Sequence, residues 1–397
     1  MTELQDCLGR IFTKNQLSPE LQLQAQSLAG MVEEKGKLSC NRCGQAVDKE
    51  KYQLPIGAYY CRSCLILGRI RSDEHLYYFS QEEFPKANVL KWRGKLTEFQ
   101  VKVSQGLVEA VAKRKDSLVH AVTGAGKTEM IYQVVAQVIN QGGAVCLASP
   151  RIDVCLELYR RLKVDFTCDI SLLLGESEAY SRSPLVIATT HQLLKFYRAF
   201  DFLIVDEVDA FPYVDNPMLY HAVHQAVKVE GTKIFLTATS TDELDKKVAK
   251  GELTRLSLPR RFHGNPLIVP QKIWLADFQK YLGQKKLVPK LRQFIQKQRK
   301  TEFPLLIFAS EIKRGQEMAE IIQSTFPNEK VGFVASTTEN RLEIVEKFRQ
   351  KEITILVTTT ILERGVTFPC VDVFVVEANH RLFSRSALVQ IAGRVGR

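Results

Sequence analysis

The 397-residue chain lacks a long hydrophobic run, since no stretch approaches the roughly 18 apolar residues that predict a membrane-spanning helix. Its first ten residues include acids and no hydrophobic segment, so a secretory signal is not expected. Acidic residues are fewer than basic ones, with 44 Asp and Glu against 55 Lys and Arg. The resulting net charge of +11 suits a polyanionic partner. We expect a cytoplasmic protein of two or three domains, with contact to the inner face of the membrane made only through partners.

The chain also lacks a second glycine-rich G-K-T loop, so it has one candidate nucleotide site. The loop lies between an apolar run that predicts a strand, Ser117 to Val122, and a helical segment that begins at Lys127. Backbone N–H groups of such a turn surround phosphate oxygens, and the helix N-terminus adds its positive dipole end. Ala121 replaces the usual first glycine, but the strand–loop–helix context still favours a P-loop. The predicted ATP-binding residues of this loop are Thr123, Gly124, Ala125, Gly126, Lys127 and Thr128.

An acidic pair, Asp206-Glu207, ends a later apolar run. In a triphosphate-hydrolysing site Lys127 would reach the β/γ-phosphates, and Thr128 and Asp206 would hold Mg²⁺. Glu207 would orient the attacking water. The loop and the acidic pair together predict an ATPase.

Four of the nine cysteines form two C-x2-C pairs, Cys40 with Cys43 and Cys61 with Cys64, separated by 17 residues. This spacing is typical of a structural zinc site, in which four thiolates fill the tetrahedron and leave no position open for catalysis. A redox pair, an iron–sulfur cluster or unrelated cysteines are the alternatives. Basic residues and tyrosines surround the pairs, which favours either nucleic-acid contact or a protein-docking surface.

Strand-like apolar runs alternate with helical segments from about Lys91 onward, which predicts two doubly wound α/β domains with parallel sheets. The spacing of Leu17, Leu21, Leu28 and Met31 predicts a helical lead-in. The expected order is a helical lead-in at 1–37, a zinc finger at 38–92, a nucleotide-binding domain at 93–256, a linker at 257–289 and a second domain at 290–397.

Further short segments stand in a fixed order along the chain: Phe99-Gln100, Ser149-Pro150-Arg151, Ala188-Thr189-Thr190-His191, Asp206-Glu207-Val208-Asp209, Thr237-Ala238-Thr239, Phe308-Ala309-Ser310, Thr358 to Val366, and Gln390 to Arg397. This ordered set resembles superfamily 2 helicases and implies two tandem RecA-like domains. A four-cysteine finger ahead of a DEVD-box motor is similar to the ComFA family, competence ATPases that help to bring transforming DNA into the bacterial cytoplasm. The motor also resembles the replication-restart helicase, but that relative carries its zinc cysteines within the helicase region.

The resemblance implies further roles. Gln100 would read adenine, Arg394 and Arg397 would be arginine fingers from the opposite domain, and Gln390 would help to join the two halves. Thr237 and Thr239 would couple the nucleotide to the strand grip. Helicases of this class continue beyond the segment at Arg397, so the second domain is expected to be truncated. Residues matching positions that face nucleic acid are Pro150, Arg151, Thr189, Thr190, His191, Ser310, Ser336, Thr358 and Thr359.

These features predict an ATP-driven single-stranded-DNA translocase that serves DNA uptake in competence. ATP, Mg²⁺ and one structural Zn²⁺ are the expected cofactors, and single-stranded DNA and other competence proteins are the expected partners. An RNA helicase, a replication-restart DNA helicase and an ATP-switched zinc-bearing scaffold are the alternative interpretations.

Overall fold

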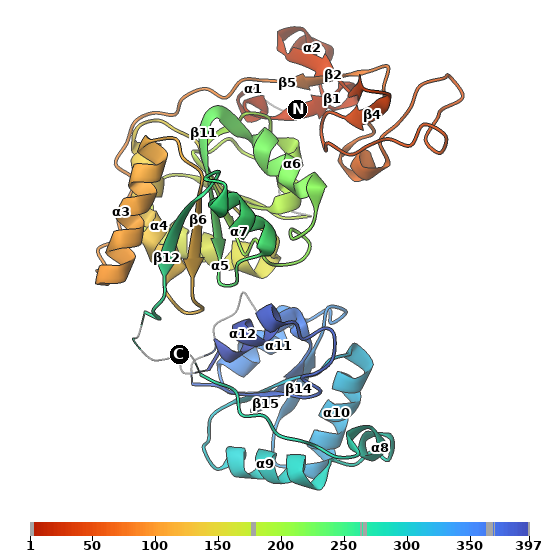
Figure 1. The fold of residues 1–397 in the computed structure, drawn as a ribbon, viewed down its shortest axis with the longest axis vertical. Coiled ribbons are helices and arrows are strands. Elements are labelled where there is room, and N and C mark those ends of the chain that lie inside the picture. Colours follow the sequence, from red (N-terminus) through yellow and green to blue (C-terminus); the bar gives the residue numbers. More distant parts are fainter. Residues whose placement is uncertain are drawn as a thin grey trace. The chain divides into compact units, whose positions relative to one another are not determined.

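The computed structural model describes residues 4–175, 180–262, 264, 268–362, 368 and 370–395. The chain divides into two compact units (Figure 1). The first comprises Met1–Ala121 and Gly126–Pro259, and the second comprises Val122–Ala125 and Arg260–Arg397. Among the described helices, none has both the length and the apolar character that crossing a bilayer requires.

The first unit begins with a small module built around two antiparallel sheets. The three-stranded sheet has the order β1-β5-β2, and a hairpin pairs β3 with β4. Its elements are α1 (Leu4–Cys7), β1 (Ile11–Thr13), α2 (Pro19–Gln24), β2 (Gln26–Ala29), β3 (Met31–Glu34), β4 (Lys37–Cys40) and β5 (His75–Tyr78).

The predicted helical lead-in is wrong over most of its length. Leu28 and Met31 lie on β2 and β3, and the helical residues between β1 and β2 are the three of 3-10 helix η1 (Lys14–Gln16) and the six of α2. The backbone of β2 pairs with β5, which lies beyond both cysteine pairs in the chain. Long-range strand pairing therefore overrides the local helical spacing, and it joins the lead-in and the cysteine segment into one module.

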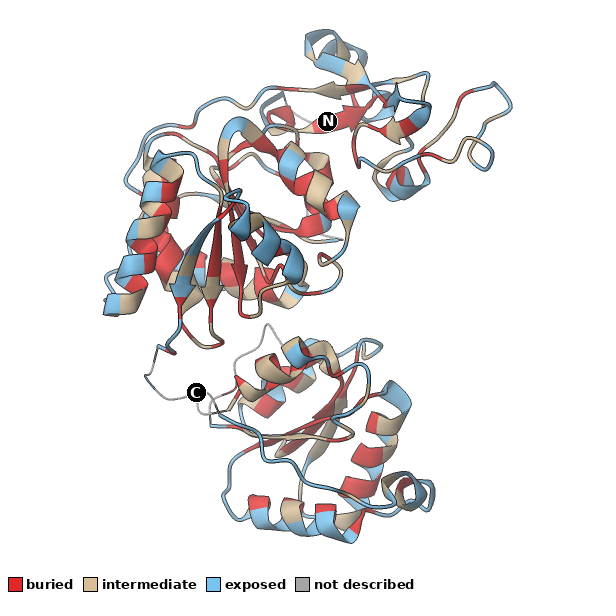
Figure 2. Ribbon diagram, viewed as in Figure 1, coloured by how far each residue is buried: buried red, intermediate tan, exposed pale blue. Residues whose placement is uncertain are grey.

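A seven-stranded, all-parallel sheet forms the rest of the first unit, in the order β12-β6-β11-β10-β7-β9-β8. Every residue of β7 and β9 is buried (Figure 2), as expected of parallel strands covered on both faces. The strands are β6 (Ser117–Ala121), β7 (Val145–Ser149), β8 (Ile170–Leu173), β9 (Leu185–Thr189), β10 (Phe200–Asp206), β11 (Val227–Thr237) and β12 (Thr254–Leu258).

Helices cover both faces of this sheet (Figure 1). They are α3 (Glu98–Ala112), α4 (Lys127–Asn140), α5 (Ile152–Asp165), α6 (Pro217–Ala226) and α7 (Asp242–Ala249), with 3-10 helix η3 at Thr190–Lys195. The apolar runs at 118–122, 144–148, 185–188, 202–205 and 234–236 predict strands, and all five are confirmed as β6, β7, β9, β10 and β11, although β11 begins seven residues earlier, at Val227. The two strands that the sequence pattern missed, β8 and β12, lie at the edges, where partial exposure breaks the continuous apolar run.

The second unit contains a four-stranded parallel sheet in the order β14-β15-β13-β16. Alternate residues of β13 enter opposite cores, since Leu305 and Ile307 pack with α9 and α10, whereas Leu306 and Phe308 pack with α11 and α12. The elements are α8 (Phe278–Gly283), α9 (Pro289–Arg299), β13 (Leu305–Phe308), α10 (Ile312–Thr325), β14 (Val331–Val334), α11 (Arg341–Arg349), β15 (Ile355–Thr358), β16 (Asp372–Val375) and α12 (Arg385–Ala392).

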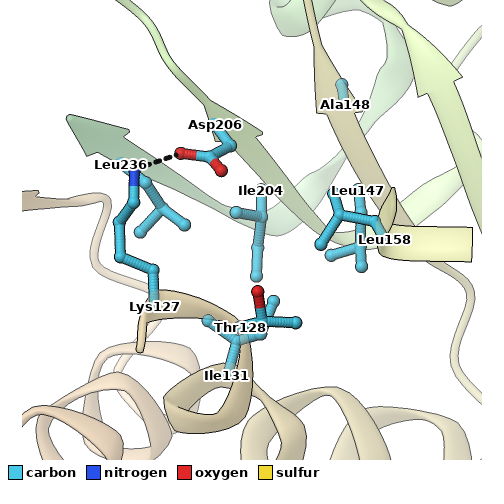
Figure 3. A pocket seen from close by; sticks show the side chains of 9 residues that line it. All are labelled: Lys127, Thr128, Ile131, Leu147, Ala148, Leu158, Ile204, Asp206 and Leu236. Atoms are coloured by element: carbon cyan, nitrogen blue, oxygen red, sulfur yellow. Dashed lines mark hydrogen bonds and ion pairs between the residues drawn. The ribbon is translucent and has the colours of Figure 1, made fainter. Parts of the chain in front are cut away.

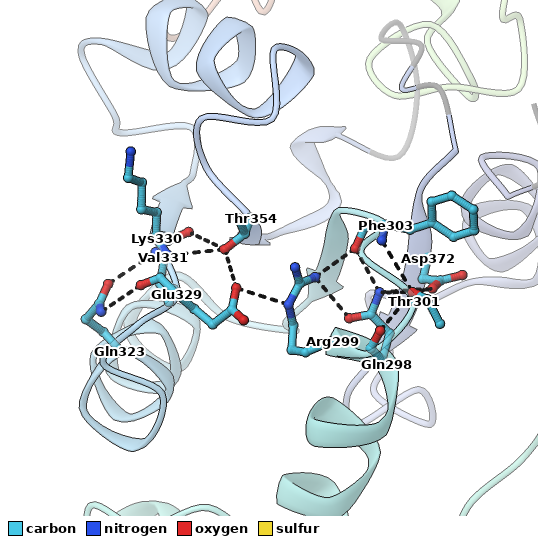
Figure 4. Close-up of polar contacts among 10 residues, drawn as sticks. All are labelled: Gln298, Arg299, Thr301, Phe303, Gln323, Glu329, Lys330, Val331, Thr354 and Asp372. Atoms are coloured by element: carbon cyan, nitrogen blue, oxygen red, sulfur yellow. Dashed lines mark hydrogen bonds and ion pairs between the residues drawn. The ribbon is translucent and has the colours of Figure 1, made fainter.

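A polar network ties α9 to the edge of this sheet at which its strands begin (Figure 4). Arg299 forms an ion pair with Glu329 at 3.0 Å, and the Thr354 hydroxyl donates to the same carboxylate at 2.6 Å. Gln298 donates to Asp372 at 2.9 Å. These contacts link α9 to the edge at which the strands begin, and in open parallel α/β sheets ligands bind at the opposite, carboxyl edge. The doubly wound α/β class is therefore confirmed for both units.

Candidate nucleotide site and cysteine cluster

The glycine-rich loop follows β6 and leads into α4. Gly124 and Gly126 have φ values of +76° and +71°, a backbone conformation that favours glycine. Gly126 is the N-cap of α4, and a Cβ there would lie 2.4 Å from the Gln100 amide nitrogen. The loop backbone thus requires glycine at this position, as a turn around phosphate does.

Lys127 and Asp206 meet at the carboxyl edge of the sheet. The Lys127 amine donates to Asp206 Oδ1 at 3.0 Å, across a small pocket (Figure 3). Burial alone would lower the pKa of Lys127, but the carboxylates of Asp206 and Glu207 outweigh it and raise that pKa, so the ammonium stays charged. The pocket is lined by Lys127, Thr128, Ile131, Leu147, Ala148, Leu158, Ile204, Asp206 and Leu236.

Glu207 follows directly on the last residue of β10. Its backbone N–H donates to Asp206 Oδ1 at 2.8 Å, and its side chain is 8% exposed. Its φ of +56° places it in the left-handed region, which is uncommon for a residue with a side chain and is found at functional sites. The fold therefore brings Lys127, Thr128, Asp206 and Glu207 together, and their roles in ATP hydrolysis stay predictions.

Asp209 joins the acidic box to the end of β11, and it was missed as a site residue. The Thr237 hydroxyl donates to Asp209 Oδ1 at 2.8 Å, and the Thr239 hydroxyl donates to the other carboxylate oxygen. The fourth position of the DEVD segment was the available signal. This contact links the two threonines to the DEVD segment that begins with the acidic pair, and their coupling role stays a prediction.

Gln100 is fully buried at the start of α3. Its amide oxygen accepts from the Thr97 backbone N–H at 2.9 Å, and its nitrogen donates to the Gly126 carbonyl at 3.0 Å. Gln100 therefore links the glycine loop to the start of α3 through hydrogen bonds. Its reading of adenine stays a prediction.

The four cysteines converge as the spacing predicts. Their sulfurs all lie within 4.8 Å of one another and are buried, with Cys40 and Cys64 3.9 Å apart and Cys43 and Cys61 3.5 Å apart. A zinc ion about 2.3 Å from each sulfur of a tetrahedron needs sulfurs about 3.8 Å apart. The donor set and its spacing therefore fit a structural zinc ion.

The cluster distributes its protons unequally. Hydrogen bonding from Cys40 lowers the pKa of Cys61 and raises the pKa values of Cys43 and Cys64, because one sulfur can lose its proton more easily when its neighbours keep theirs. Arg42 lies within the first knuckle and is 1% exposed, with its guanidinium donating to the Leu67 carbonyl at 2.9 Å. The sequence analysis counted Arg42 among the basic residues around the cysteine pairs, but its side chain is buried beside the sulfurs, where its charge complements thiolates.

The first cysteine knuckle packs directly on α6. The Gln225 amide donates to the Asn41 carbonyl at 3.2 Å, and a Cβ on Gly44 would lie 2.7 Å from the His221 ring. One buried cluster contains the cysteines together with Leu219 and Val223 of α6. Because α6 lies in the chain between the acidic box and β11, the knuckle contacts the element that links Asp209 to Thr237.

The predicted nucleic-acid residues lie at or beyond the carboxyl ends of strands in each sheet. Thr189 ends β9, Thr190 follows it, and both are buried. The Ser310 hydroxyl donates to Glu377 at 3.0 Å, and the Thr358 hydroxyl donates to the Val334 carbonyl at 2.9 Å. The Ser310 and Thr358 hydroxyls are therefore engaged within the protein, so a phosphate contact at these two positions would fall to backbone amides. Pro150 and Arg151 lie in the loop before α5, and Arg151 forms an ion pair with Asp153 at 3.8 Å. His191 and Ser336 are exposed, whereas Thr359 is buried.

The last described segment holds Gln390 and Arg394. Gln390 lies on α12 and is 8% exposed, and Arg394 follows the end of that helix and is 5% exposed. Arg397 lies outside the described residues. The arginine-finger roles stay predictions.

Two parallel α/β units with a P-loop and an acidic box define a superfamily 2 helicase fold, here with a four-cysteine module at the N-terminal end. Three family models match the chain: Competence protein ComFA N-terminal domain over 9–78, DEAD/DEAH box helicase over 99–246, and Helicase conserved C-terminal domain over 286–397. The competence protein ComFA of Streptococcus pneumoniae is 71% identical over 99% of this chain and 90% of its own length. The chain belongs to the ComFA family of competence proteins.

A second curated relative and a solved structure are also similar to this chain. The competence protein ComFA of Bacillus subtilis is 40% identical over 91% of this chain and 80% of its own length. A solved structure of the DEAD-box helicase Mss116 bound to single-stranded RNA and UDP-BeF has a TM-score of 0.58 and 21% identity, over 76% of this chain and 68% of that one. At that identity the structural likeness shows the fold alone, which is two RecA-like domains.

Proposed function

We propose that this chain is an ATPase that moves along single-stranded DNA and drives the uptake of transforming DNA. The observation that carries the proposal is the placement of Lys127, Asp206 and Glu207 at one edge of a parallel sheet, beside a glycine loop. Membership of a family of competence proteins supports the uptake role.

In this proposal Lys127 leaves Asp206 and binds the β/γ-phosphates, and Asp206 and Thr128 hold the metal ion. Mg²⁺ would neutralise charge on the phosphates when bound. Glu207 positions the attacking water, and Arg394 stabilises the charge that spreads over the transferred group. Asp209 passes the change at Asp206 to Thr237 and Thr239. Alternating grips of the two domains would then move the strand.

The decisive experiment measures ATP hydrolysis with and without single-stranded DNA. We expect DNA to stimulate turnover, and we expect Lys127→Ala to lower it by at least about a hundredfold because phosphate charge is then left uncompensated. Lys113→Ala is the matched control, since Lys113 is an exposed lysine that pairs with Glu109 on α3. No stimulation of the wild type by DNA would contradict the proposal, and stronger stimulation by a matched RNA oligomer would favour an RNA helicase.

We also propose that the four cysteines hold one structural zinc ion. Cys40→Ala should release the metal, because three thiolates bind zinc far more weakly than four, and should lower the thermal stability of the first unit. Metal content and thermal unfolding check this, with Cys168→Ala, outside the cluster, as the control. Unchanged zinc content in Cys40→Ala would exclude this ligand set.

A further inference from the structure

Arg394 lies in the turn that ends α12, between Gly393 and Val395, whose backbone carbonyls flank it on both sides. The N–H groups of Gly393, Arg394 and Val395 bond back to carbonyls of α12 at 3.0–3.2 Å, so the three residues form a closing turn. The carbonyls of such a turn have no partner within the helix, and they carry the negative end of its dipole. A cationic side chain with several N–H donors can hydrogen-bond these carbonyls and interacts favourably with the helix dipole.

Arg261 supplies that cation. Its Nη2 donates to the Gly393 carbonyl at 3.3 Å and to the Val395 carbonyl at 3.0 Å. These are the carbonyls on the two sides of Arg394. Arg261 is 6% exposed and lies 132 residues before Gly393 in the chain, in the same compact unit. Burying a guanidinium is costly unless it is hydrogen-bonded, so this placement has to be held by the contacts that it makes.

We propose that Arg261 is a positioning residue for Arg394, an inference that rests on the proposed ATPase function. One guanidinium that binds both flanking carbonyls fixes the backbone dihedral angles of Arg394, and thereby the direction in which its side chain leaves the turn. A group that stabilises developing charge acts only when it is held in place before the reaction. Lysine keeps the charge at the helix end but lacks the planar, multiply donating head group, so it can replace arginine only in part.

Hydrogen exchange tests the clamp without any enzyme assay. In Arg261→Met the amides of Gly393, Arg394 and Val395 should exchange at least about fivefold faster than in the wild type, because the turn opens more often. Arg260→Met is the matched control, since it removes the same charge from the exposed neighbouring residue. Unchanged exchange at these three amides in a folded Arg261→Met protein would overturn the proposal.

Kinetics test the consequence. Arg261→Met should lower kcat of DNA-stimulated hydrolysis by about tenfold with little change in KM for ATP, and Arg261→Lys should recover part of the loss. In an Arg394→Ala background Arg261→Met should have no further effect, since it acts through Arg394. Additive losses in the double variant would overturn the inference while leaving the ATPase intact. An inactive wild type would instead contradict the proposed function, and exchange would still decide the clamp.

Discussion

At the scale of single residues, the Asp209 carboxylate connects two segments of the first unit, because each of its oxygens accepts a hydrogen bond from a different threonine. Asp209 binds the hydroxyls of both Thr237 and Thr239, and it lies three residues after Asp206. A carboxylate that receives two hydroxyl donors stabilises them more strongly than a neutral amide would. We therefore expect the end of β11 to respond to changes at the acidic box.

Asp209→Asn should separate hydrolysis from its stimulation. The amide accepts only through one oxygen, so one of the two hydroxyl contacts is weakened. We expect basal ATP hydrolysis to stay within about threefold of the wild type, while stimulation by single-stranded DNA falls by about tenfold. Steady-state ATPase rates with and without DNA measure both quantities. Asp169→Asn, at an exposed position, serves as the control, and equal loss of basal and stimulated rates in Asp209→Asn would argue against a coupling role.

At the scale of elements, the cysteine module and the nucleotide-binding sheet share one core. The knuckle at Cys40–Gly44 packs on α6, and a ring pair joins Tyr78 of β5 to Tyr197 at a centroid distance of 4.5 Å. The Gly9 carbonyl also accepts from the Tyr197 backbone N–H at 2.9 Å. The cysteine cluster and the parallel sheet that carries Asp206 are thus connected through packed elements of one unit, whereas the spacing predicted a separate finger.

Gly44 and Gly57 allow this interface to be tested with a matched pair. Both have positive φ, +69° and +83°, so alanine strains the backbone at either position. A Cβ at Gly44 would also collide with His221, whereas a Cβ at Gly57 meets open space. We expect Gly44→Ala to cost about 1–3 kcal/mol of unfolding free energy more than Gly57→Ala, by overpacking. Denaturant unfolding measures the difference, and Gly44→Ala with His221→Ala should recover part of it. Equal losses in the two single variants would show that the contact contributes nothing.

At the scale of the whole molecule, the net charge of +11 should govern strand binding. The Ser310 and Thr358 hydroxyls are engaged within the protein, so phosphate contacts by lysines, arginines and backbone amides should dominate the free energy of binding. We expect affinity for single-stranded DNA to fall at least about tenfold between about 50 and 200 mM salt, and to vary little with base sequence. Fluorescence anisotropy with oligomers of different sequence measures both effects. A flat salt dependence would contradict an electrostatic grip.

The sequence by itself was sufficient for features that depend only on residues near one another in the chain. Neighbouring residues are enough to predict four features of the candidate sites. These are the glycines with positive φ, the lysine at a helix start, the acidic pair after a buried strand and the two cysteine pairs. Continuous apolar runs also revealed the central strands, because strands covered on both faces admit few polar residues. The edge strands β8 and β12 lacked this signal.

Only the tertiary structure decided which distant segments meet. The strands of the N-terminal module pair across the whole cysteine segment, the first knuckle rests on α6, and Arg261 binds the carbonyls beside Arg394. Each contact joins residues far apart in the chain, and its energy comes from burial and hydrogen bonding that exist only after folding. Neighbouring residues encode a backbone conformation or a donor set, whereas a partner dozens of residues away leaves no local pattern to read.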